Sequence, residues 1–431
     1  MRKQLCEPRY DELVNGPRRP GELAGSYDLA AVTATDTANG SRIFTATYHD
    51  TEERHLARAG IVLRRRMENG KSVWEVEVGN ETRAADGGPG GPPQEILDLL
   101  AAPLLGRTLV EVAKTRTRTN GEDVETAVLE GQHVITMVSD WKPKLPKPKR
   151  RPQPKKGAPA LDRFRAYLRQ QVDELARHDP GARLDDDPER IHQIRVATRR
   201  ARSALRTARR LLDREWAQGL RDELKWLGNE LAPARDLDVL LTRLAKDADE
   251  LGKPAATIVR QLESERRRAQ KQLVAALESP RYLALLVELE RAADAPRVRT
   301  ADARLDKLAR KEFGRLRRAV RALGKSPSDE ALHEVRKRGK RARYSAELAG
   351  GKRAKKFAEA AKAFQDVVGD HQDAVVAVER LTALVPRTKS PEAVFAAGRL
   401  LERQQSRRRQ ARKSLPKAWR KLQRQGRKVR A

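Results

Sequence analysis

The chain has 431 residues, of which 39% are hydrophobic, 4% aromatic and 35% charged, and its formal net charge is +31. A positive charge of this size indicates an anionic partner, so nucleic acid, membrane surfaces and inorganic polyanions are the candidate classes. The shortage of aromatic residues counts against single-stranded nucleic acid, whose binders stack bases on aromatic rings.

The sequence contains no apolar run long enough for a membrane span. The longest run, ILDLLAAPLL (96–105), is interrupted by Asp98, and the N-terminus lacks the apolar core of a signal peptide. The single cysteine, Cys6, excludes an internal disulfide and indicates a reducing compartment. We therefore expect a soluble cytoplasmic protein.

Residues 1–141 are predicted to form an α+β, mostly antiparallel domain. A flexible Gly/Pro loop is predicted at 85–93 and a helix at 94–105. Alternation of apolar and polar residues predicts six strands. Their ranges are 42–51, 60–67, 72–80, 108–119, 124–130 and 133–141.

Residues 142–158 form a predicted linker. Its segment 142–156 holds eight Lys/Arg and five Pro and no acid, so it cannot pack a core and should run extended. A solvated spacer is the simpler interpretation, and a tether that grips a polyanion is the alternative.

Residues 159–431 are predicted to be a helical domain. Asp187 followed by Pro188 predicts a helix start. The C-terminal segment 406–431 is predicted to be an amphipathic helix that frays into a basic tail. Periodicity of 3.6 residues predicts further helices at 161–178, 220–232, 237–251 and 257–278.

The helical half contains an internal repeat. IHQIRVATRRARSALR (191–206) carries one histidine and five arginines without an acid, and LHEVRKRGKRARYSAEL (332–348) repeats its basic pattern. Each copy follows a helix and precedes a predicted acidic turn, at 231–241 and at 368–378. We therefore expect two tandem, pseudo-symmetric halves in one bundle.

Each repeat places a row of basic residues beside an apolar stripe. At 100° per residue the first row falls within roughly 80° of arc and runs about 20 Å along the helix, roughly 120° from Ile194, Ala201 and Leu205. The row residues, our candidate polyanion ligands, are His192, Arg195, Arg199, Arg202, Arg206, His333, Arg336, Lys340 and Arg343.

Two interpretations of these rows remain. A solvated basic face balanced by acids on neighbouring helices explains one row, but the same spacing twice favours an anion-binding surface. Arginine forks and lysine charges suit phosphate oxygens, and two rows brought together would line a groove that fits a polymer. Since no base-reading motif stands out, a polymer of phosphates without bases fits best.

The repeat resembles the CHAD family, named for a histidine-bearing α-helical domain. The resemblance rests on His192-x-x-Arg195 with Arg199-Arg200-x-Arg202, and on the same pattern from His333 to Arg343. It covers about 159–420, and it implies a helical bundle that binds inorganic polyphosphate in a basic groove and associates with polyphosphate granules.

The first half resembles CYTH domains, which have the triphosphate tunnel fold. The resemblance rests on residues 47–66 and 112–119. Active members hold a divalent metal with an N-terminal ExExK strand, which MRKQLCEPRYDEL does not contain. We therefore predict a degenerate domain without catalysis. Glu75 and Glu77 are a conceivable substitute metal pair, but alternation in an exposed strand explains them more simply.

Three functional hypotheses follow. The first is a polyphosphate-binding protein without catalytic residues, metal or cofactor. The second is a metal-dependent triphosphatase in residues 1–141. The third is a nucleic-acid binder acting through the linker and residues 401–431, which carry thirteen Lys/Arg against one acid. Weaker phosphate candidates are Arg200, Arg341, Arg165, Arg169, Arg315, Arg318, Arg64, Arg66, Arg116 and Arg118.

Overall fold

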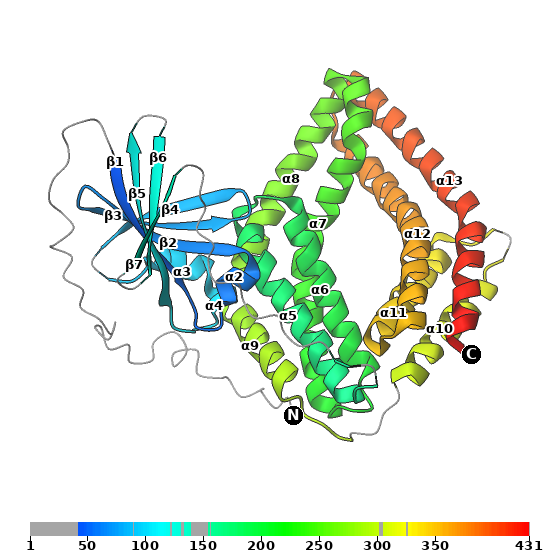
Figure 1. Ribbon diagram of the computed structural model, residues 1–431. Helices are drawn as coiled ribbons and strands as arrows, with labels where there is room; N and C mark the ends of the chain where they lie inside the picture. The colour runs from blue at the N-terminus through cyan, green and yellow to red at the C-terminus, as the bar shows by residue number, and fades with distance from the viewer. Residues whose placement is uncertain are drawn as a thin grey trace, which may run out of the picture. The chain divides into compact units, whose positions relative to one another are not determined.

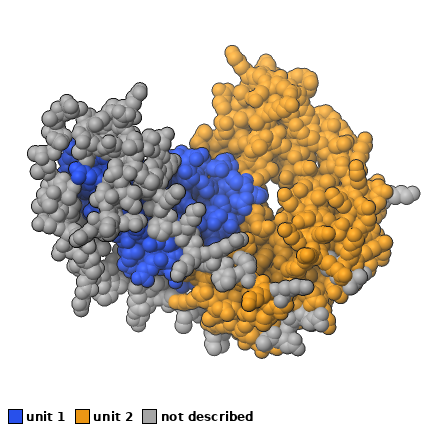
Figure 2. Space-filling view, viewed as in Figure 1, with its two compact units in different colours: residues 1–152, 173–194, 277–287 blue, residues 153–172, 195–276, 288–431 orange. Residues whose placement is uncertain are grey.

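The structure is a computed structural model, in which the chain forms two compact units. The first comprises residues 1–152, 173–194 and 277–287, and the second comprises 153–172, 195–276 and 288–431 (Figure 2). The structure describes residues 42–88, 90–120, 123–130, 133–138, 154–155, 157–300, 305–324 and 326–430.

The first unit is built on a single antiparallel sheet (Figure 1). Among the described residues its strand order is β4-β3-β2-β1-β5-β6-β7, and every neighbouring pair is antiparallel. This confirms the predicted α+β, antiparallel character. The strands are β1 (Arg42–Asp50), β2 (Ile61–Glu68), β3 (Lys71–Val78), β4 (Glu81–Gly87), β5 (Val110–Asn120), β6 (Asp123–Glu130) and β7 (His133–Val138).

Three short helices pack against this sheet and share a hydrophobic core with it. They are α2 (His55–Ala59), α3 (Gln94–Leu99) and α4 (Ala101–Leu104). Trp74 and Leu63 from the strands pack in one cluster with Leu100, which is fully buried. Because strand side chains alternate, this packing leaves the intervening polar side chains on the opposite face.

Strand β4 was not predicted from the sequence. Residues 85–87, expected to begin a flexible loop, pair with β3 in the register Ala85↔Trp74 and Gly87↔Ser72. Burial of Ala85 in the core of the sheet explains why these residues are ordered as a strand in spite of the glycines.

The remaining elements are helices. Parts of α5, α6 and α9 and the last residue of α8 belong to the first unit, and the rest of these helices belongs to the second. The helices are α5 (Ala160–Leu184), α6 (Pro188–Thr207), α7 (Arg214–Leu251), α8 (Lys253–Leu277), α9 (Pro280–Asp294), α10 (Leu305–Arg321), α11 (Asp329–Ala349), α12 (Lys352–Leu384) and α13 (Pro391–Arg430), with a 3-10 turn, η2, at Val385–Arg387. None of the helices in the described part of the chain is long and apolar enough to span a membrane.

The helical order confirms the two tandem halves. The series α5, α6, α7 is repeated by α10, α11, α12, with the basic repeat on the second helix of each series. In the later half α10 to α13 share a core that contains Phe313, Phe357, Phe364 and Leu422. Each half thus buries its apolar stripes and holds its basic helix on a rigid support.

The two predicted acidic turns are wrong, because both segments are helical. Residues 231–241 lie inside α7, which continues through Pro233, and residues 368–378 lie inside α12. A proline within a helix removes one backbone hydrogen bond. Leu231, Ala234 and Leu237 are buried around it, and this packing offsets the loss.

The C-terminal segment is also more ordered than predicted. Helix α13 continues to Arg430, so residues 406–430 are helix and not a frayed tail. Residues 142–153, most of the predicted linker, lie outside the described residues, as does the N-terminal segment 1–41. The domain bounds drawn from composition remain a prediction.

Candidate anion-binding site

Helix α6 holds its basic row through a well-packed apolar face. The Asp187 carboxylate accepts a hydrogen bond from the Glu189 amide at 2.8 Å, at the start of the helix. Ile194, Ala201 and Leu205 are fully buried. Burial of this stripe fixes the rotation of the helix, and the rotation directs the arginines to the neighbouring side.

Helix α11 is held in the same way. Ser328 caps its first turn by accepting a hydrogen bond from the Ala331 amide at 3.2 Å. Val335, Ala342 and Ala346 are buried in the core of the second half. The apolar stripes predicted for both helices are thus the packed faces.

The two basic rows meet within the second unit. Arg195 and Arg199 of α6 lie close enough to Arg336 and Lys340 of α11 that charges from the other helix contribute to the lowered pKa values of Arg195, Arg336 and Lys340. We call these four residues the cation cluster.

Lys340 is affected most by this arrangement. Burial, followed by the positive charges of Arg336, Arg199 and Arg195, lowers the pKa of Lys340 to about 6, against a smaller opposing effect of Asp373. Burial is also the main reason that the pKa values of Arg195 and Arg336 are lowered. Like charges held together in this way favour the binding of an anion.

The cluster also contains unused hydrogen-bond donors. Arg195 Nη1, Arg199 Nε and Arg336 Nε are buried and have no hydrogen-bond partner among the described residues. A buried donor without an acceptor costs about 1–3 kcal/mol and is rare in folded proteins. Three such donors on neighbouring guanidinium groups indicate a binding site for oxygen atoms of an anion.

Two carboxylates border the cluster in a pseudo-symmetric arrangement. Asp236 of α7 lies 3.3 Å from Arg195, and Asp373 of α12 lies 3.6 Å from Arg336. Both acids come from the segments expected to be turns. Because these segments are helical, each acid instead pairs with the first arginine of the neighbouring row.

The basic surface continues beyond the cluster. Burial is the first cause of the lowered pKa values of Arg202 and Arg206, and the next are Arg221 for Arg202 and Arg341 for Arg206. Arg341 was a weaker candidate in the sequence, and Arg221 of α7 was not identified at all. Only the packing of α7 against α6 brings Arg221 to the row.

The remaining row residues make other contacts. His333 Nδ1 lies 2.8 Å from Gln372 Oε1, and half-buried His192 lies in the first unit at the start of α6. Arg343 pairs with Glu347 at 2.8 Å, and Arg200 pairs with the same carboxylate at 3.2 Å. Arg343 and Arg200 are therefore bound within the protein.

The weaker candidates on the helices flanking the rows also have internal partners or lie in solvent. Arg165 donates to the Ala293 carbonyl at 3.3 Å, and Arg169 pairs with Glu290 at 3.3 Å. Arg315 pairs with Glu312. Arg318 is exposed.

Two candidate arginines of the sheet, Arg64 and Arg66, are paired with carboxylates. Arg64 of β2 lies 2.6 Å from Glu75 and 2.8 Å from Glu77 across the β2–β3 pair, and Arg66 lies 3.6 Å from Glu75. Glu75 is buried, so the expectation that both glutamates lie on an exposed strand face is wrong for Glu75.

The other two candidate arginines of the sheet are on β5. Arg116 is exposed, and the side chain of Arg118 lies outside the described residues. The described residues contain no group of three or more His, Cys, Asp or Glu that could hold a metal ion.

Comparison with known proteins assigns the family. The CHAD domain family matches residues 166–382. The chain belongs to the CHAD domain family. This match includes both basic rows, α7 and nearly all of α12, so the cation cluster lies inside the CHAD domain.

Individual relatives agree with this assignment. Two uncharacterized proteins of Mycobacterium tuberculosis, from strains CDC 1551 / Oshkosh and H37Rv, are each 33% identical over 294 residues, which cover 63% of this chain. Those residues are 55% of each relative, so the chain matches about half the length of these proteins.

Two solved structures are also similar to this chain. PptA from Streptomyces chartreusis is 28% identical with a TM-score of 0.51, and covers 61% of this chain and 99% of its own. The CHAD domain from the plant Ricinus communis is 27% identical with a TM-score of 0.50, and covers 60% of this chain and 91% of its own.

Proposed function

We propose that the CHAD domain binds linear inorganic polyphosphate along the cation cluster and the adjoining basic row. The observation that carries this proposal is the set of buried, unpartnered guanidinium N–H groups on Arg195, Arg199 and Arg336. Phosphate oxygens are strong acceptors that match arginine forks in geometry and charge.

A polymer suits the site better than a single small anion. From Arg195 to Arg206 the basic row extends about 16 Å along α6 at 1.5 Å per residue, and α11 runs a second row beside it. One phosphate group would contact only a few of these cations. A flexible chain of phosphates can contact both rows along their whole length.

The proposed role requires no chemistry. Glu75 is paired with Arg64 and Arg66, which supports a non-catalytic CYTH-like half without a metal. Polyphosphate binding by a cytoplasmic protein would place it at polyphosphate granules. Nucleic acid remains the second candidate partner, and it is supported by a different surface, described below.

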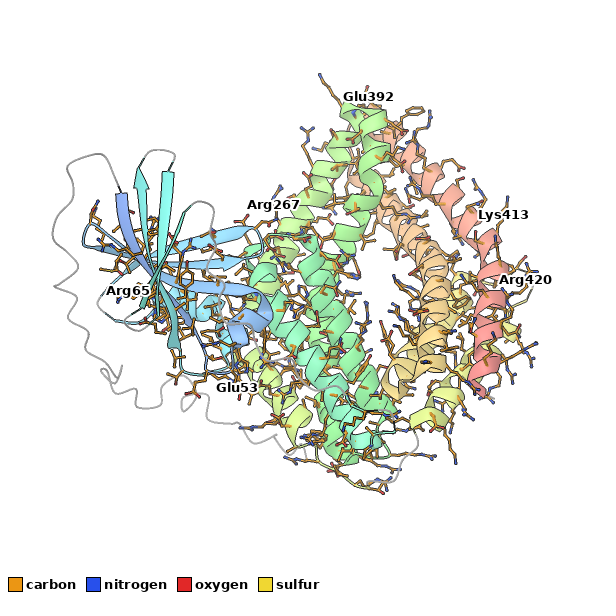
Figure 3. All side chains as sticks on the ribbon, viewed as in Figure 1. Glu53, Arg65, Arg267, Glu392, Lys413 and Arg420 are labelled. Carbon is orange, nitrogen blue, oxygen red and sulfur yellow. The ribbon has the colours of Figure 1, made fainter. Side chains whose placement is uncertain are left out.

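A charge-reversal variant tests the proposal. We expect that replacing Arg195, Arg199, Arg336 and Lys340 by Glu abolishes polyphosphate binding, while the far-ultraviolet circular dichroism of the helices persists. The matched control reverses four exposed cations of α8 that have no ion pair among the described residues, Lys253, Arg267, Arg268 and Lys271. Figure 3 labels Arg267 of this set.

The two variants change the net charge equally. If polyphosphate binding survives in the cluster variant, or is lost equally in the α8 variant, the cluster is not the binding site. A phosphate-release assay with triphosphate and Mg²⁺ or Mn²⁺ tests the alternative. Turnover that disappears in Glu75→Gln would contradict the non-catalytic interpretation of the sheet.

A further inference from the structure

Helix α13 has two segments with opposite electrostatic character. Up to Arg412, four of its arginines pair with acids of α7 and α11. Arg403 and Arg407 pair with Asp247 of α7, and Arg408 and Arg412 pair with Asp329 of α11. These pairs attach the first part of the helix to the rest of the unit.

Beyond Arg412 the pattern changes. The next residues contain no acid, and their cations have no ion pair or hydrogen bond among the described residues. Six exposed cations share one side of this segment, and we call them the α13 stripe. They are Lys413, Lys417, Arg420, Arg424, Arg427 and Lys428.

The helix geometry aligns the stripe. The six positions fall within an arc of roughly 100° and extend about 22 Å along the helix. Leu415, Ala418 and Leu422 lie on the other side of the helix and pack into the core of the second half. Figure 3 labels Lys413 and Arg420, whose side chains extend away from α12.

The stripe is a surface different from the cation cluster. The cluster faces between α6 and α11, whereas the stripe is on the outer side of α13, which packs against α12 and α10 (Figure 1). Six like charges at spacings of three and four residues repel one another by a few tenths of a kcal/mol per pair. Nothing in the described part of the chain offsets this repulsion.

The chemistry of the stripe favours one class of partner. Trp419, the aromatic residue of this segment, packs against Phe364 with ring centroids 5.7 Å apart, so no exposed ring is offered for stacking unpaired bases. Leu422 is buried in the core and Leu415 and Ala418 pack against it, so these apolar residues are not directed outward for insertion into a membrane. What remains is contact with phosphates alone.

The shape of the surface separates a duplex from a flexible polymer. A single convex helix touches its partner from one side, and a flexible polymer would lose conformational freedom when it is held against that side. A nucleic-acid duplex presents one charge per about 1.7 Å of its axis in a fixed array, and binding releases its counterions. The partner that fits is therefore rigid and carries pre-ordered phosphates.

We propose that the α13 stripe binds the phosphate backbone of duplex nucleic acid, independently of sequence. The cation cluster and the stripe then bind two different polyanions at once, and the protein connects a polyphosphate chain to a duplex. The stripe rests on observations separate from those for the cluster, so either proposal stands without the other.

The test uses the full chain and a short DNA duplex of arbitrary sequence. The stripe variant carries Lys413→Gln, Lys417→Gln, Arg420→Gln and Arg424→Gln. The control carries Gln at Lys253, Arg267, Arg268 and Lys271 of α8. Glutamine keeps helix propensity close to that of Lys and Arg. We expect duplex affinity to fall about tenfold or more in the stripe variant, and the slope of log affinity against log salt to fall by about 3 to 4.

Polyphosphate binding separates the possible outcomes. It should be unchanged in the stripe variant, and saturating polyphosphate should leave the duplex bound to the wild-type chain. If the α8 control loses as much duplex affinity, net charge alone explains binding and the proposal fails. It also fails if the cation-cluster variant loses duplex binding, or if polyphosphate displaces the duplex, because one surface then serves both.

Discussion

Arginine side chains gather in two regions of this molecule with opposite results. On the sheet, Arg64 and Arg66 face the buried carboxylate of Glu75 across one strand pair. In the CHAD domain, Arg199 faces Arg336 and Lys340 across two helices. The first arrangement satisfies its charges internally, and the second keeps like charges together.

This difference distinguishes a structural arginine from a binding arginine. A paired arginine stabilises the fold and has little left to offer a ligand, since its donors are used. A guanidinium with buried, unpartnered donors costs stability until an anion supplies the acceptors. The number of arginines in a segment therefore does not show whether they bind a ligand. The groups beside each side chain decide that.

The largest effect is expected from breaking the cluster. The double variant Arg199→Ala, Lys340→Ala should weaken polyphosphate binding about 100-fold or more, because two charge-assisted contacts of about 1.5–3 kcal/mol each are lost. Isothermal titration calorimetry measures the affinity, and thermal unfolding should show no loss of stability. Arg343→Ala is the control, since Arg343 is paired with Glu347. Equal loss in both variants would contradict the assignment.

The pH dependence should show that Lys340 takes up a proton on binding. Its pKa is about 6 in the free protein, and an anion favours the charged form, so polyphosphate affinity should fall as pH rises above 6, by up to about tenfold per pH unit. Titrations in buffers of different ionisation enthalpy count the protons. Lys340→Met should remove the uptake, and an unchanged pH profile would disprove the role of Lys340.

The same group predicts a pH dependence of stability. Folding lowers the Lys340 pKa, so the unfolded chain binds more protons between the folded and unfolded pKa values. The contribution of Lys340 to the free energy of unfolding therefore rises with pH above about 6, up to its ordinary pKa. Chemical denaturation at several pH values, on wild type and Lys340→Met, measures this contribution as the difference in slope.

Breaking an arginine pair of the sheet should change stability and leave polyphosphate binding unchanged. Arg64→Ala should lower the free energy of unfolding by about 2 kcal/mol, because buried Glu75 loses its closest partner and keeps only Arg66, while polyphosphate affinity stays unchanged. Arg83→Ala is the control, since Arg83 is exposed on β4. Denaturant unfolding measures the change. A loss of polyphosphate affinity in Arg64→Ala would mean that the sheet takes part in binding.

The smallest expected effect concerns the carboxylates beside the cluster. Asp236→Asn and Asp373→Asn should each raise polyphosphate affinity about threefold, since an exposed or half-exposed pair is worth about 0.2–1 kcal/mol. The two effects should be similar, because the positions are pseudo-symmetric. Asp249→Asn, on the exposed side of α7, should change nothing. A decrease in affinity would show that the acids position the arginines instead of competing for them.

The sequence by itself determined the helical class of the second half and its internal repeat. Periodicity separated Ile194, Ala201 and Leu205 from the basic residues of α6, and the structure buries that stripe. It also predicted the antiparallel strands of the first half. These features follow from the spacing of apolar and polar residues over a few helical turns or along a single strand.

Only the tertiary structure decided which cations meet and which are neutralised. Residues 231–241 were predicted to be an acidic turn, yet α7 continues through Pro233, and Leu231, Ala234 and Leu237 are buried around it. Contact between α7 and α6 places Arg221 beside Arg202 of the basic row, and Arg343 is paired with Glu347. Charge pairing depends on the distances between side chains on different helices, and the spacing of residues along the sequence does not specify those distances.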